Sequence, residues 1–94
     1  VQVSRIFCLG KIGNRQAVKD FLASLDTTRA EDCLAAAAAH AGLGQIEQGM
    51  TYLQAAADKG KIPEYLLFDF CYAPLQTHPA FHNILQAYGL QPMQ

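Results

Sequence analysis

The sequence predicts an all-α fold of short antiparallel helices, and three observations support this prediction. Four glycines, at positions 13, 44, 60 and 89, each follow or interrupt an apolar stretch with helical spacing, where a helix is expected to stop. No stretch alternates between apolar and polar residues, so we expect no strands. The chain has 94 residues and is 51% apolar, which suits one core with about six short helices and excludes disorder. We therefore expect a single domain over residues 1–94.

The first helical hairpin is expected within residues 1–28. Its two helices should cover residues 2–11 and residues 14–25, with Gly13 in the hinge between them. Glycine suits such a hinge because it adopts backbone conformations that other residues avoid.

The second helical hairpin is expected within residues 29–61. Thr28 and Glu31 form a capping-box pattern, in which the threonine oxygen accepts an amide hydrogen and the glutamate reaches back. A helix should therefore begin at Arg29, run through five consecutive alanines and end near Gly42. A second helix over residues 45–58 follows from apolar residues at helical spacing, namely Ile46, Met50, Leu53 and Ala57.

The two hairpins align with each other at an offset of 31 residues. The alignment pairs Gly13 with Gly44, and it also pairs Ile12 with Leu43, Phe21 with Tyr52 and Leu22 with Leu53. A helical hairpin cannot bury its apolar face alone and must stack on a neighbour. The repeat therefore predicts an α-solenoid.

Residues 62–94 should form a capping pair of helices and a tail. We expect a short apolar helix over residues 62–70, an irregular stretch over residues 71–78 and a last helix over residues 79–88. His78 precedes Pro79, and proline suits the first position of a helix. The last helix carries an apolar stripe made of Phe81, Ile84, Leu85 and Tyr88, which should cap the stack.

Charge and composition exclude several classes of protein. The net charge is −1, and the basic residues Lys11, Arg15 and Lys19 make only a short stripe, so nucleic-acid binding is not expected. No apolar run approaches the roughly 18 residues of a membrane span. The three cysteines Cys8, Cys33 and Cys71 are widely spaced, and we expect them to be reduced core residues in a cytoplasmic protein. The sequence starts without methionine or a signal peptide, so we expect a piece of a longer protein.

The sequence contains no convincing catalytic or metal-binding site. His78 and His82 are four residues apart and could share a metal ion, but no further ligands complete a zinc site. His40 is expected to pack and to form hydrogen bonds inside a helix. We see no catalytic triad and no phosphate-binding glycine loop, and we expect neither an enzyme nor a cofactor.

Residues 30–63 resemble a tetratricopeptide repeat. With Gly44 in the turn between its helices, the family's characteristic sites fall on Cys33, Ala36, Ala37, His40, Leu53, Ala56 and Pro63. The closing run over residues 74–90 resembles the tail that ends many bacterial tetratricopeptide regions. The resemblance implies a protein-interaction or scaffolding module of a larger regulatory protein, bacterial in origin.

The family also implies where a partner binds, namely the concave face lined by the first helix of each hairpin. Carried over by register, that face contains Val3, Phe7, Leu34, Ala38 and Ala41. These residues are apolar and mostly small, which predicts a groove for a peptide or an amphipathic helix and excludes a clamp for peptide carboxylates. The last helix or further repeats could instead fill this face. Because two repeats are fewer than a stable array needs, self-association through the first hairpin is also expected.

A second resemblance gives the alternative function. Residues 44–63 are similar to the second half of a pentatricopeptide repeat, a family that binds single-stranded RNA. RNA recognition of this kind requires polar residues on the first helices to contact the bases, whereas the corresponding helix here is polyalanine. Protein binding is therefore the preferred hypothesis.

Overall fold

A computed structural model describes residues 3–62, 66 and 70–89 of the chain. Its helices are α1 (Val3–Lys11), α2 (Arg15–Ala23), α3 (Ala30–Gly42), α4 (Ile46–Asp58), the 3₁₀ helix η2 (Phe70–Thr77) and α5 (Pro79–Ala87). The described residues contain no strand. The prediction of an all-α fold is confirmed.

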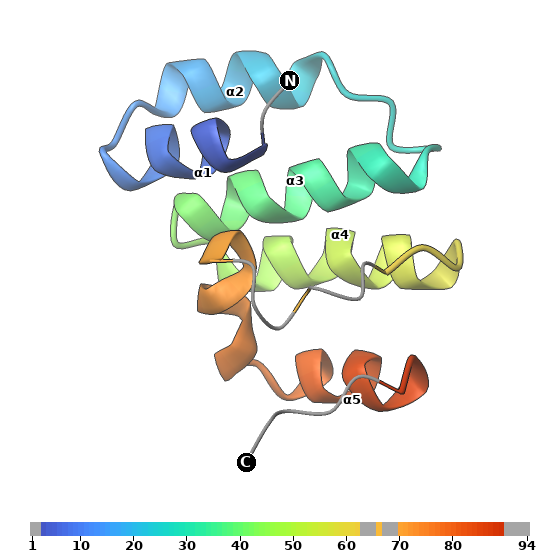
Figure 1. Ribbon diagram of the computed structural model, residues 1–94. Coiled ribbons are helices and arrows are strands. Elements are labelled where there is room, and N and C mark those ends of the chain that lie inside the picture. The colour runs from blue at the N-terminus through green and yellow to red at the C-terminus, as the bar shows by residue number, and fades with distance from the viewer. Residues whose placement is uncertain (1–2, 63–65, 67–69, 90–94) are drawn as a thin grey trace.

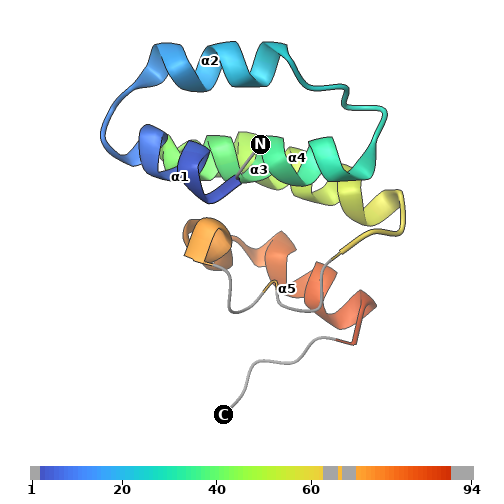
Figure 2. The ribbon, with the colours of Figure 1, turned by 45° about the horizontal axis from the view of Figure 1, so that its top comes forward.

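The helices are stacked along one direction of the molecule. In Figure 1, α2 lies at one end, α5 lies at the other, and α1, α3 and α4 lie between them. Helix α3 is central, because it packs against α1 and α4 and also against η2. Figure 2 shows η2 beside one end of the α1, α3 and α4 layer, on the side where α5 lies.

The turns after α1 and α3 have the same backbone structure. Gly13 and Gly44 have φ angles of +86° and +78°, a backbone conformation that residues with a Cβ atom rarely adopt. The next amide donates to a carbonyl five residues back in both turns, from Asn14 to Leu9 and from Gln45 to His40, at 2.9 Å each. Each turn is therefore a Schellman motif. The glycines at positions 60 and 89 also have positive φ, so all four predicted helix stops are confirmed.

Helix α2 is shorter than predicted. Asn14 lies before its first residue as the N-cap, and its side chain accepts a hydrogen bond from the Ala17 amide. At the other end, the Ser24 and Leu25 amides donate to carbonyls three residues back instead of four. The helix therefore tightens and ends at Ala23.

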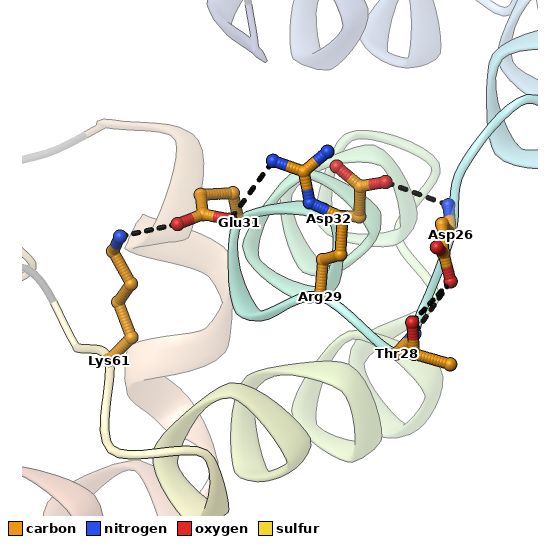
Figure 3. A network of polar contacts seen from close by, with 6 residues as sticks. All are labelled: Asp26, Thr28, Arg29, Glu31, Asp32 and Lys61. Carbon is orange, nitrogen blue, oxygen red and sulfur yellow. Dashed lines mark hydrogen bonds and ion pairs between the residues drawn. The ribbon is translucent and has the colours of Figure 1, made fainter.

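The predicted capping box does not form at the start of α3. Thr28 donates its hydroxyl and its amide to the Asp26 carboxylate, at 2.6 Å and 3.1 Å, and the N-cap residue Arg29 makes no side-chain cap. The Asp32 carboxylate accepts the Asp26 amide at 2.7 Å (Figure 3). Thr28 is therefore held in a local Asx-type turn before the helix, and Arg29 rather than Thr28 occupies the N-cap position.

Glu31 also points away from the predicted cap. It pairs with Lys61, which follows α4, and lies 3.7 Å from the Arg29 guanidinium (Figure 3). The hydrogen bond from Lys61 lowers the pKa of Glu31, and the Thr28 hydroxyl and amide lower the pKa of Asp26. The Glu31–Lys61 pair ties the start of α3 to the residues that follow α4.

Two apolar clusters hold the helices together. The smaller one joins α1, α2 and α3 through Ile6, Val18, Phe21, Ala35 and Ala39. The larger one joins α1, α3, α4, η2 and α5, and its fully buried members include Leu53, Leu75 and Phe81. The polyalanine run lets neighbouring elements approach α3 closely. All five of its alanines are buried, as are Cys33, Ala41 and Gly42 of the same helix.

The C-terminal part differs from the prediction in one element. The predicted helix over residues 62–70 lies mostly outside the described residues. Of the stretch 71–78, which was predicted as irregular, residues 71–77 belong to η2. The last helix begins as predicted, with His78 as N-cap and Pro79 at the first position. Cys33 and Cys71 are buried, but Cys8 is exposed, so the prediction of a core role is wrong for Cys8.

Candidate binding groove between α4 and α5

The face predicted to bind a peptide is covered in this structure. Phe7, Ala38 and Ala41 are buried in the larger core cluster, together with Cys71, Tyr72 and Leu75 of η2. Leu34 is half-buried and packs against the same cluster. Val3 belongs to α1, but its side chain is outside the described part of the structure.

The covering segment is η2, an occupant that the sequence did not predict. The Tyr72 hydroxyl donates to the Leu34 carbonyl at 3.1 Å. The ring of Phe70 meets that of Phe7 edge-on, with 5.3 Å between centroids. Residues of the chain itself therefore fill the predicted groove, and a partner would reach Phe7, Ala38 and Ala41 only after η2 had moved away.

A different hollow lies open along the seam between α4 and α5. One part has a volume of about 390 Å³ and is lined by α4 and by the start of α5, and the second has about 190 Å³ and is lined by α4 and the end of α5. The two parts share Gln54 and Asp58, so they lie next to each other along the same seam. We call this feature the α4–α5 groove; its lining is Glu47, Met50, Thr51, Gln54, Ala55, Ala57, Asp58, His78, Ala80, Asn83, Ile84, Ala87 and Tyr88.

The groove has an apolar floor and polar walls. Met50 and Ile84 are buried, and alanines from both helices leave little bulk above them. Tyr88 closes the far end, where its hydroxyl donates to the Ala57 carbonyl at 2.6 Å and holds α5 against α4. The walls are therefore held in place by contacts between the two helices.

His78 fixes the near end of the groove. Its Nδ1 accepts a hydrogen bond from the Ala80 amide at 3.1 Å, which is its capping role for α5. An imidazole that accepts at Nδ1 carries its hydrogen on Nε2, so Nε2 donates to the Glu47 carboxylate, 3.1 Å away. His78 thus joins α5 to α4 as a neutral ring.

Two carboxylates stand along the α4 wall without a cationic side chain to neutralise them. Glu47 is bonded to the neutral His78 ring, and Asp58 accepts from the Gln54 amide at 3.1 Å. In the described ranges, neither carboxylate forms an ion pair with lysine or arginine. The groove therefore carries negative charge at two places.

The other candidate residues do not converge on a site. His40 stacks on Tyr52 with 5.3 Å between ring centroids and bonds to Gln45, which is the packing role predicted for it. His82 is exposed beside Phe81, away from the contacts of His78. No three metal-binding side chains gather anywhere in the described part of the chain.

The short basic stripe lies on the first hairpin. Lys11, Arg15 and Lys19 are all exposed, and the Lys11 ammonium lies 5.6 Å from the centre of the Phe7 ring. None of the helices in the described ranges combines the length and the apolar character needed to cross a bilayer.

The sequence held a signal for the groove that the prediction did not use. Glu47, Thr51, Gln54 and Asp58 recur at positions i, i+4, i+7 and i+11, which places them on one face of α4. Such a polar stripe ordinarily marks a face in contact with solvent only. Here the stripe forms one wall of the groove because α5 packs beside α4. The spacing of residues along the sequence does not predict that packing.

Comparison with protein-family models, curated proteins and solved structures gives no match to this chain. The relation to tetratricopeptide repeats therefore stays a prediction from the sequence.

Proposed function

We propose that this chain is a protein-interaction module that binds a segment of another protein in the α4–α5 groove. The observation that carries the proposal is the groove itself, whose two adjoining parts are open to solvent and lined by side chains from two helices. A peptide can lie along such a groove, with apolar side chains on the floor and polar contacts at the walls. The proposal keeps the interaction role predicted from the sequence and moves it to another surface.

The arrangement of the remaining polar residues favours binding over catalysis. Catalytic sites bring a nucleophile, a base and an orienting group together, and the groove offers one histidine that is engaged at both nitrogens. The groove is shallow and open, whereas a catalytic pocket shields its substrate from water. Its long shape suits an extended contact surface.

A selection of displayed peptides on the purified protein tests this proposal. We expect enriched peptides that compete with one another and lose affinity for the Gln54→Trp variant, because Gln54 lines both parts of the groove. The Trp side chain would occupy the space that a ligand needs.

The chain offers a matched control for this variant. Gln16 on α2 bonds to Asp20 four residues later at 2.9 Å, as Gln54 bonds to Asp58 on α4 at 3.1 Å. Gln16→Trp therefore makes the same change on an exposed helix outside the groove. Peptides that bind both variants equally, or no enrichment at all, would refute the proposal.

A further inference from the structure

We infer that the partner is a cationic amphipathic helix whose two basic residues, eleven positions apart, meet Glu47 and Asp58. This inference rests on the proposed function, because it names the chemistry of the ligand in the same groove. Three features carry it: the spacing of the two carboxylates, their unneutralised charge, and the small residues between them.

The spacing of the carboxylates fits a helix. Glu47 and Asp58 are eleven residues apart on α4. At 1.5 Å per residue this separates them by about 16 Å along the axis, and at 3.6 residues per turn they lie only about 20° apart around it. A second helix laid along α4 presents its own positions i and i+11 with the same separation and on one face.

The negative charges of the two groove carboxylates favour a ligand that carries cationic groups. His78 and Gln54, which hold the two carboxylates in place, are neutral donors. Lys61 follows Asp58 by three residues, but its ammonium is paired with Glu31. Bringing lysine or arginine to each carboxylate therefore adds an attraction that the free protein does not already make.

The backbone chemistry of the groove favours a helix over an extended peptide. Both walls are helices, whose backbone groups already bond within each helix, so the groove has no strand edge for an extended peptide to pair with. A helical ligand satisfies its own backbone and needs only side-chain contacts. Ala55, Ala80 and Ala87 leave room for it to approach closely.

Designed helical peptides test the inference by fluorescence anisotropy on the 94-residue protein. One alanine-rich peptide carries lysines at positions i and i+11, and its partner carries them at i and i+9, on opposite faces of the helix. We expect the first peptide to bind more tightly, and we expect rising salt to weaken it. Glu47→Gln and Asp58→Asn should each weaken it about two- to fivefold. Asp20→Asn, the matched carboxylate on α2, should have no effect.

Several outcomes would overturn the inference. Equal binding of the two peptides, binding that is insensitive to both groove carboxylates, or no binding of either peptide contradicts a cationic helix. If selected peptides still need Gln54 in that case, the proposed function stands and only the ligand chemistry is wrong. A concentration-dependent dimer that the double variant Glu47→Gln and Asp58→Asn abolishes, and that the peptide does not displace, would assign the groove to a second copy.

Discussion

Replacing Gly42 by alanine should push α1 away from α3. A Cβ atom built on Gly42 lies 2.5 Å from the Phe7 carbonyl oxygen and 3.0 Å from the Phe7 Cα. Ordinary contact begins at 3.4 Å, so the helices must separate by about 0.9 Å, the difference between 3.4 and 2.5 Å. Both contacts are to backbone, and no side-chain rotation can relieve them. Gly10 makes the reciprocal contact, since its own Cβ would lie 2.8 Å from the Gly42 carbonyl carbon.

The expected loss follows from two opposing effects. Overpacking of this kind costs about 1–3 kcal/mol. Alanine gains up to about 1 kcal/mol over glycine within a helix, and Gly42 is the last residue of α3. We expect a net loss of about 1–2 kcal/mol, which in a domain of this size lowers the melting temperature by about 4–16 °C.

Urea unfolding followed by circular dichroism measures this loss. Gly49→Ala is the matched control, because the Cβ atom there would lie 2.8 Å from a methyl carbon of Leu75, a side chain that can rotate, and 3.2 Å from the Ala37 carbonyl. The loss should be larger at Gly42 than at Gly49. A Gly42→Ala protein as stable as the original would show that α1 and α3 are not held at this distance, and the reasoning would fail.

Three further predictions concern single contacts. Tyr72→Phe removes the hydroxyl that donates to the Leu34 carbonyl and should lower the free energy of unfolding by about 0.5–1.5 kcal/mol, with faster hydrogen exchange in η2; unchanged exchange would contradict the role of this bond. His78→Ala removes the cap of α5 and should cost about 1 kcal/mol in urea unfolding, whereas His78→Asn should retain most of the stability; equal losses would argue against capping. Because the folded pKa of Glu31 lies below its ordinary value of 4.5, the stabilisation is present above that pH and is lost as the pH falls through the folded pKa. Acid titration of unfolding should therefore show a small, salt-sensitive loss that Lys61→Gln abolishes, and an identical pH profile for the variant would exclude the pair as its source.

Local signals in the sequence placed the helix ends well. The glycines at positions 13 and 44 stop their helices with the same hydrogen bonds, because the left-handed conformation depends on the residue and its immediate neighbours. Pro79 and His78 likewise mark the start of α5 through the missing amide of proline and a short-range cap. The capping box does not form, because Thr28 belongs to a turn built on the Asp26 carboxylate, which the pattern does not include, and Arg29 becomes the N-cap.

The candidate site was far less predictable than the helices. Register placed Phe7, Ala38 and Ala41 together correctly, as members of one cluster, but it did not show that η2 lies over them. The spacing of the polar residues on α4 shows that they share one helix face. Whether that face lines a groove depends on where α5 packs. Both features depend on contacts between segments that are far apart in the sequence.

Local sequence signals are enough to specify an all-α chain, the positions where most of its helices begin and end, and which helix faces are apolar. Those properties come from backbone preference, capping and spacing within a few residues. Which apolar face stays open depends on how the helices pack against one another. Helix η2 covers the inner face of α1 and α3, while the packing of α5 leaves a groove beside Glu47 and Asp58. An apolar helix face can be buried by any of several other apolar surfaces of the chain. Which surface covers it depends on how well the two shapes fit when they are closely packed.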